Sequence, residues 1–317
     1  MQTYDRIVLA IPHAEPVFDL SLWSNPDAVL RDVWRWTDWH TDNLFAYAEH
    51  CDPRIKHVIG RVNRFNCDLE RLINDPLEEI GQGILYTRSH SGATRTVPEN
   101  KRREWFQAWN WYRERIVESG LGSKNPILLD CHSFPSDIDP EVDICIGWNE
   151  DESKPDDEVL SSVRDVLANA GFRVAFNKPY SNSILPEGWQ GSSMLIELNK
   201  GIYMKELGME LLPRVGDVDR ALRSLFDVLL GSPAPKIDPG DWSLVLELFP
   251  DAKVQGIHIP DDPDILSKST SRGIRQGSWL YERGYGYWNY DQIPPEMLWR
   301  AKVLFGPVGY NVPRTEK

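Results

Sequence analysis

Three segments of the sequence place a metal-binding or proton-transferring side chain inside or at the end of an apolar run. His132 lies in the run Leu-Leu-Asp-Cys-His-Ser-Phe-Pro, and His13 ends the run Arg-Ile-Val-Leu-Ala-Ile-Pro-His. Glu197 is the one carboxylate in Met-Leu-Ile-Glu-Leu. Short apolar runs indicate buried strands, and open α/β sheets bind ligands just outside the strand ends. We therefore expect these three side chains to meet at one edge of a sheet, as in a metal-assisted hydrolase.

A catalytic zinc ion usually has three protein ligands and keeps one position for water, whose pKa the metal lowers to about 7. His13 and His132 are the expected first two ligands of one ion. The residues alone leave the third ligand open among four neighbours: Glu15, Asp38, His40 and Asp42. Glu15 would point to the same side of an extended segment as His13, whereas Asp38 could instead cap a helix. A buried histidine bonded to the backbone or to Asp130 is the alternative interpretation of His132.

Glu197 is isolated among aliphatic residues, where an ionised carboxylate needs a partner or a raised pKa. Beside water activated by a metal it would serve as a general base and return the proton to the leaving amine. The alternative is a glutamate on the open face of an edge strand. Arg64, Asp68 and Arg71 follow a predicted strand. One arginine could stabilise an oxyanion and another could clamp a substrate carboxylate, although salt bridges with Glu70 would explain the same residues.

Composition indicates a globular protein that does not bind nucleic acid. The chain has 317 residues, of which 41% are hydrophobic and 26% charged, which is enough apolar material for a large core. Its net charge of -13 would repel phosphate backbones and anionic membranes. The basic residues 101–103, Arg113 and Arg115 are expected to form the solvated face of a helix. Four cysteines without a C-x-x-C pair, and no signal peptide or membrane-spanning run, predict a cytoplasmic location.

Strands and helices alternate along the first 230 residues. Apolar runs predict strands near residues 6–12, 56–62, 127–130, 142–147, 172–176 and 193–199. Helical spacing predicts helices near residues 26–36, 37–50, 99–119, 156–170 and 215–230. The third helix carries an apolar stripe that should pack in the core: Trp105, Trp109, Tyr112 and Ile116.

This order of elements predicts a three-layer α/β domain over residues 1–230, with a mostly parallel or mixed sheet and helices on both faces. Residues 231–317 are rich in Pro, Gly, Trp and Tyr. They are expected to form a C-terminal extension packed on the domain, which acts as a lid or as the interface of a homo-oligomer.

Taken in order, these motifs resemble the N-formylglutamate amidohydrolase family, which is related to the zinc carboxypeptidases and aspartoacylases. The matching segments are Ile11-Pro-His13, Thr37-Asp-Trp-His40 with Leu44, Asn63 to Arg71, Asp130-Cys-His-Ser133, Asp143 with Gly147, Asn177-Lys-Pro-Tyr180 and Ile196 to Tyr203. The resemblance implies a zinc-carboxypeptidase-like fold and one Zn²⁺ ion held by His13, Asp38 and His132. It also implies roles for residues nearby: Glu197 as the base, Arg64 at the oxyanion, Arg71 and Tyr180 as substrate-binding residues, and Asp68 orienting the arginines.

Three departures from the family pattern concern the substrate pocket. Pro-His-Ala-Glu stands where the family has Pro-His-Ser/Ala-Gly, Asp-Leu-Glu-Arg stands for Asp-Leu-Asn-Arg, and Pro-Tyr-Ser-Asn-Ser replaces Pro-Tyr before a Gly-Gly pair. Glu70 adds an acid beside Arg71, which would weaken a pocket for the anionic groups of glutamate. We therefore expect zinc-dependent hydrolysis of a small N-acyl amino acid of the N-formyl kind, rather than of formylglutamate itself. The alternatives are a carboxypeptidase-like peptidase acting on short peptides and an inactive relative that binds a ligand.

Overall fold

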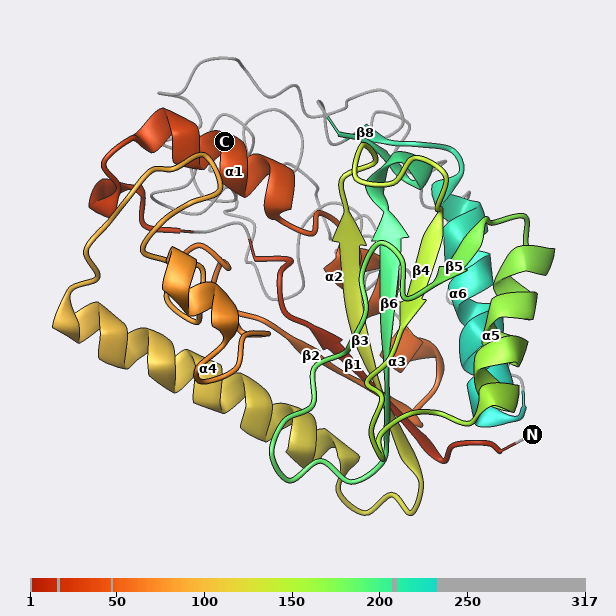
Figure 1. Cartoon of the computed structure of the whole chain (residues 1–317). Coiled ribbons are helices and arrows are strands. Elements are labelled where there is room, and N and C mark those ends of the chain that lie inside the picture. Colours follow the sequence, from red (N-terminus) through yellow and green to blue (C-terminus); the bar gives the residue numbers. More distant parts are fainter. Residues whose placement is uncertain (1, 16–17, 47, 207–209, 233–317) are drawn as a thin grey trace, which may run out of the picture.

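The structure is a computed structural model. It describes residues 2–15, 18–46, 48–206 and 210–232 (Figure 1). The expected C-terminal extension lies outside the described residues from residue 233 onward. None of the helices in the described ranges is both long and apolar enough to cross a membrane.

A six-stranded mixed sheet forms the centre of the described chain. Its strands are β1 (Arg6–Ile11), β2 (Ile55–Ile59), β3 (Pro126–Phe134), β4 (Ile144–Gly147), β5 (Val174–Phe176) and β6 (Ser192–Asn199). They lie in the order β2-β1-β3-β6-β4-β5. Neighbouring strands are parallel, except that β4 runs antiparallel to β6. Two short strands, β7 (Met204–Lys205) and β8 (Glu210–Leu211), pair with each other outside this sheet.

Helices cover both faces of the six-stranded sheet (Figure 1). The long helix α4 (Glu99–Gly120) lies on one face, and α5 (Asp157–Asn169) and α6 (Val215–Leu230) lie on the other. The remaining helices are α1 (Pro26–Trp36), α2 (Thr41–Phe45), α3 (Ala48–Cys51) and three short 3-10 helices: η1 (Leu20–Leu22), η2 (Pro76–Ile80) and η3 (Lys200–Ile202). The α/β architecture predicted from the sequence is therefore confirmed.

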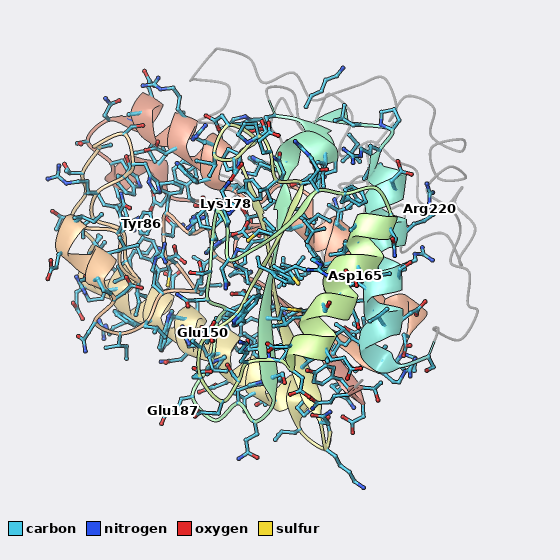
Figure 2. All side chains as sticks on the ribbon, turned by 45° about the vertical axis from the view of Figure 1, so that its right-hand side comes forward. Tyr86, Glu150, Asp165, Lys178, Glu187 and Arg220 are labelled. Carbon is cyan, nitrogen blue, oxygen red and sulfur yellow. The ribbon has the colours of Figure 1, made fainter. Side chains whose placement is uncertain are left out.

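Alternating side chains of β1 divide the core into two layers. Val8 and Ala10 belong to a cluster with the apolar stripe of α4, whose four predicted residues are all buried. Ile7 and Leu9 belong to the cluster that includes the buried faces of α5 and α6. This is the pattern of a strand buried on both faces, because successive side chains point to opposite sides. Charged side chains such as Glu187 and Arg220 lie on the surface, whereas Tyr86 is fully buried (Figure 2).

The end of α1 and the start of α2 fix the position of the segment that contains Asp38. Asn25 caps the start of α1 by accepting a hydrogen bond from the Ala28 backbone, and Thr37 ends that helix as its C-cap. The next helix, α2, has His40 as its N-cap, in the left-handed region with a φ of 66°. The interpretation of Asp38 as a helix cap is therefore wrong. Asp38 lies in the turn between α1 and α2, and neither helix has its side chain as a cap.

Candidate functional site

The carboxyl ends of four parallel strands meet at one edge of the sheet. His13 follows β1, and the loop from Asn63 to Arg71 follows β2. His132 and Glu197 lie near the ends of β3 and β6. His132 was expected just beyond a strand that stopped near Asp130, but β3 continues to Phe134. The strand therefore fixes the backbone on both sides of His132.

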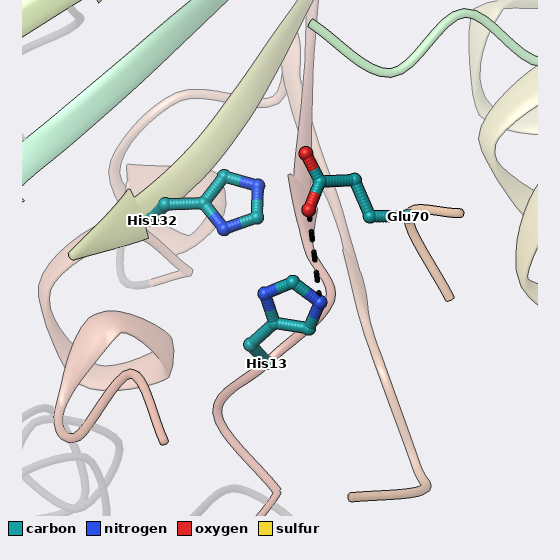
Figure 3. A group of neighbouring side chains, drawn as sticks. All are labelled: His13, Glu70 and His132. Carbon is teal, nitrogen blue, oxygen red and sulfur yellow. Dashed lines mark ion pairs between the residues drawn. The ribbon is translucent and has the colours of Figure 1, made fainter. Parts of the chain in front are cut away.

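The two histidines lie against each other. Their ring centroids are 4.9 Å apart, and the residues are 1% and 3% exposed. Together with Glu70 they form a group in which one ligand atom of each residue lies within 4.8 Å of the others (Figure 3). This is the kind of clustering that a metal site requires.

Each histidine ring has a carboxylate at Nε2. His13 Nε2 lies 2.8 Å from Asp68 Oδ1, and His132 Nε2 lies 2.9 Å from Asp130 Oδ1. A carboxylate only accepts, so Nε2 of each ring carries the proton. Metal-ligating histidines usually donate their second N–H to such a partner, which leaves the other nitrogen for the ion.

The two Nδ1 atoms lie near Asp38. Its Oδ2 is 3.1 Å from His132 Nδ1 and 3.7 Å from His13 Nδ1. His13 Nδ1 is buried and has no hydrogen-bond partner. Two ligands of a tetrahedral zinc lie roughly 3.4 Å apart, given bonds of about 2.0 to 2.1 Å. Two imidazole nitrogens and one carboxylate oxygen are ligand types that zinc accepts, and the two separations from Asp38 are close to this value.

Electrostatics in this cluster favour charged groups. Although burial acts in the opposite direction, the hydrogen bond from His132 and the nearby His13 ring hold the pKa of Asp38 well below its ordinary value. Burial likewise acts to lower the pKa of His132, but Asp130 and Asp38 raise it well above the usual value. A cation bound at Nδ1 would take the place of the proton there.

Glu70 approaches the cluster from another side. Its Oε2 lies 3.9 Å from His13 Nε2, which is the nitrogen already bonded to Asp68, and its side chain is 29% exposed. The group of close ligand atoms in the described residues does not include Glu15, His40 or Asp42. The Glu15 backbone carbonyl accepts from Asn63, and His40 Nδ1 contacts the Asn43 amide. Asp42 accepts a hydrogen bond from the Asn43 backbone.

Three hydrogen bonds hold the turn that carries Asp38. The Asp38 N–H donates to the His13 carbonyl over 3.0 Å. Lys200 Nζ donates to the Arg35 carbonyl over 2.6 Å, and the Tyr203 hydroxyl donates to the Trp39 carbonyl over 2.8 Å. Lys200 is only 1% exposed, and burial lowers its pKa to about 8. We did not single out Lys200 or Tyr203 from the sequence, although both lie in the motif that follows Glu197.

The loop after β2 carries the predicted arginines. Asp68 Oδ2 accepts from Arg64 Nη2 and from the Tyr86 hydroxyl, both over 3.3 Å, and lies 3.6 Å from Arg71 Nε. Asp68 therefore contacts both arginines and His13 at once. The Nε atoms of Arg64 and Arg71 are buried and have no hydrogen-bond partner, so each retains a free donor.

Two features fix the path of this loop. Gly60 passes so close to β1 that an added Cβ would lie 2.3 Å from the Pro12 carbonyl oxygen. Farther along, Arg113 Nη2 donates to the carbonyls of Glu70 and Arg71, over 3.1 and 3.0 Å. Arg113 is buried, so its prediction as part of a solvated face was wrong. It instead holds the segment that positions Glu70 and Arg71.

Glu197 lies beside His132 on the neighbouring strand. The two residues are register partners in the parallel pairing of β3 with β6. Glu197 Oε2 is buried without a hydrogen-bond partner, and the residue is 8% exposed. Burial, with the negative charges of Asp38 and Glu70, raises the pKa of Glu197 to about 8, while His132 opposes the shift. A carboxyl with such a pKa can take up or release a proton near neutral pH.

Tyr180 lies in the segment between β5 and β6 and packs against Phe134, with ring centroids 6.1 Å apart. Burial and the charge of Glu197 raise its pKa to about 12. The hydroxyl therefore stays protonated near neutral pH and can donate a hydrogen bond.

Comparison with known proteins identifies one family and two similar structures. Residues 5–204 match the family model described as N-formylglutamate amidohydrolase. The N-formylglutamate amidohydrolase of Ralstonia eutropha JMP134 has a similar structure, with a TM-score of 0.56 and 18% identity over 73% of this chain and 93% of that one. A gene product from Agrobacterium tumefaciens is similar with a TM-score of 0.53 and 16% identity, over 72% of this chain and 90% of its own. No curated protein matches the sequence. At these identities the two structures show a shared fold.

Proposed function

Because its family match spans residues 5–204, the chain belongs to the N-formylglutamate amidohydrolase family, and we propose that it hydrolyses the amide bond of a small N-acyl amino acid. The observation that carries this proposal is the cluster of His13, Asp38 and His132 with Glu197 alongside. All four residues lie within the part of the chain that matches the family.

We propose that His13, Asp38 and His132 hold one zinc ion. Asp38 is preferred to Glu70 as the third ligand because it faces Nδ1 of both rings, whereas Glu70 faces a nitrogen that Asp68 already occupies. When bound, such an ion supplies Lewis acidity and a nucleophile from water at neutral pH.

Glu197 is the proposed general base. Its unpaired Oε2 can accept a proton from the attacking water and return it to the leaving amine. Its place beside His132 puts that proton transfer next to the proposed zinc ligands. Burial raises the pKa of Glu197 to about 8, and a cation held by the neighbouring residues would lower that pKa and favour the carboxylate that accepts the proton.

The arginine loop is the proposed substrate-binding part. Arg64 would donate to the oxygen that gains negative charge during attack, since preorganised donors stabilise such charge best. Arg71 would bind the substrate carboxylate, and Asp68 would orient both guanidinium groups through its contacts of 3.3 and 3.6 Å. Tyr180 would donate a hydrogen bond to the substrate from the side of Glu197.

Metal analysis with a substrate panel tests the proposal. The purified protein should contain about one zinc per chain when supplied with zinc, and it should hydrolyse N-formyl or N-acetyl amino acids. His132→Ala should lose both the metal and the activity, while His57→Ala, which changes a histidine paired with Glu49, should keep both. Cleavage of peptides alone would indicate a carboxypeptidase-like peptidase. A protein that binds no metal and cleaves nothing would be the inactive relative, and the proposal would be wrong.

Two further variants distinguish the third ligand. Asp38→Ala should lose the metal, because it removes the carboxylate that faces both Nδ1 atoms. Glu70→Gln should keep it. The reverse result would assign the third ligand to Glu70.

A further inference from the structure

A pair of stacked rings borders the arginine loop. Trp36 is the last residue of α1, and the ring of His90 stacks on it with centroids 4.6 Å apart and an angle of 28° between the planes. The edges of Phe65 and Tyr86 also meet His90, each with its centroid 6.0 Å away. Although His90 packs against these rings, the residue remains exposed. The stack therefore presents an aromatic surface to solvent.

The stack is held in place from α1. The loop that carries His90 is fastened by Asp32, whose carboxylate accepts from the Ser91 backbone N–H over 2.8 Å and from the Ser91 hydroxyl over 2.6 Å. Asp32 and Trp36 lie on the same helix. One helix thus fixes both halves of the stack, so the rings form a preorganised surface.

This surface adjoins the proposed active site through two hydrogen bonds. The Trp36 carbonyl accepts from Arg64 Nη1 over 3.3 Å. Tyr86, which lies under His90, donates its hydroxyl to Asp68, the partner of His13. The rings therefore stand beside the residues that we assign to substrate binding.

Unpaired donors point to a ligand at this place. Three buried N–H groups in the described chain lack a hydrogen-bond partner here: Trp36 Nε1, Arg64 Nε and Arg71 Nε. Buried donors are rarely left unpaired, because each costs free energy. The two arginines belong to the loop that we assign to substrate binding, so a substrate carboxylate beside that loop would be near donors that still lack an acceptor.

The charges around the arginines are already balanced. Asp68 contacts both Arg64 and Arg71, and the charge of Glu70 also acts on Arg71. Burial and the nearby charge of Arg64 lower the pKa of His90 to about 4, so its ring is neutral at pH 7. With Arg71 assigned to the substrate carboxylate, a second carboxylate near this loop would meet the negative charges of Asp68 and Glu70.

We propose that Trp36 and His90 form the wall that recognises the substrate side chain, and that the substrate is an N-acyl amino acid with an aromatic or large apolar side chain. This inference rests on the proposed function. The stacked rings offer such a side chain aromatic contact, while Asp68 and Glu70 disfavour an acidic one.

The test compares kcat/KM for N-formylphenylalanine, N-formylglycine and N-formylglutamate in the zinc-loaded protein. The wild-type protein should prefer N-formylphenylalanine to N-formylglutamate. His90→Ala should reduce the ratio of kcat/KM for phenylalanine over glycine about tenfold, as expected for loss of one aromatic contact and its buried area. The change should lie mainly in KM. His90→Phe, which keeps a ring, should restore most of the ratio, and His57→Ala should leave it unchanged.

The outcomes separate this inference from the proposed function. If the protein hydrolyses N-formylglutamate best, the inference is overturned and the amidohydrolase proposal stands. An unchanged ratio in His90→Ala, with zinc content equal to that of the wild-type protein, would also overturn the role of His90. If none of the three compounds, nor their N-acetyl counterparts, is hydrolysed, both proposals are wrong.

Discussion

The ammonium group of Lys200 lies 2.6 Å from the main-chain carbonyl oxygen of Arg35, so the residue after β6 holds the end of α1. Tyr203 makes the matching bond to Trp39 from the same short segment. The two donors bracket Asp38. The place of one proposed metal ligand therefore depends on side chains that follow the strand of the proposed base.

Lys200→Met and Tyr203→Phe should each weaken zinc binding about tenfold, the lower end of the range for residues that support metal ligands. Each change leaves a carbonyl beside Asp38 without its donor. Zinc titration against a competing chelator measures the effect. Tyr112→Phe is the matched control, because Tyr112 is fully buried but its hydroxyl has no partner. Lys200→Arg should recover part of the affinity, and wild-type affinity in Tyr203→Phe would contradict the role of this bond.

Asp130→Asn should lower zinc affinity by about 10- to 100-fold. The carboxylate fixes the proton of His132 on Nε2, whereas an amide can present either a donor or an acceptor there. The same titration measures the loss. Asp137→Asn, which alters a 67% exposed carboxylate paired with Arg35, should bind zinc as the wild-type protein does. Equal affinities in the two variants would show that Asp130 has no part in holding the ligand.

Glu197→Gln should reduce kcat by roughly 10² to 10⁴ while the zinc content stays at the wild-type level. The change removes a base but no proposed ligand. Steady-state kinetics together with metal analysis separate these effects. Glu187→Gln, on the surface (Figure 2), serves as the control. Full turnover in Glu197→Gln would assign the proton transfer to another group.

Asp143→Asn should lower the free energy of unfolding by about 1 to 2 kcal/mol at pH 7. The Asp143 carboxylate accepts from the Arg173 backbone and guanidinium, over 3.0 and 2.7 Å. Although burial opposes it, these bonds hold the pKa of Asp143 below its ordinary value. A lowered folded-state pKa stabilises the protein above the unfolded-state pKa of about 3.9, and this contribution is lost as pH falls through the folded-state value.

Denaturant titrations at pH 7 and at acidic pH check this sign. The difference between the wild-type protein and Asp143→Asn should shrink as the pH falls. Asp165→Asn changes an exposed acid paired with Arg164 and should have little effect at either pH. A difference for Asp143→Asn that grows toward acidic pH would contradict the assignment.

The fold was largely predictable because apolar runs and helical spacing follow from burial. The stripe on α4, for example, is buried as predicted. The direction of β4 was not predictable, since the run Ile-Cys-Ile-Gly has the same pattern whichever way it is paired, and it lies antiparallel to β6. Short apolar segments specify burial but not the neighbour against which they pack.

The site was predictable only in part. His13 and His132 were expected to converge because each was predicted to follow an apolar strand directly, and the structure places their rings 4.9 Å apart. Glu70 was expected to affect substrate choice, yet it also lies in the group of close ligand atoms. His90 and Trp36 gave no signal, because they meet only after the loop is fastened to α1. Such pairs depend on contacts between segments that are distant in sequence, and the local sequence pattern around each residue does not predict them.

The pairing of β3 with β6, which aligns His132 with Glu197, has a consequence for how this protein can vary. Backbone hydrogen bonds between the two strands fix the distance between these two residues. Changes in the surrounding loops can therefore alter substrate selectivity without moving either residue. A one-residue deletion within β6 before Glu197 would change the position of its side chain. It would turn the carboxylate to the opposite side of the sheet, among the aliphatic side chains that face α5 and α6.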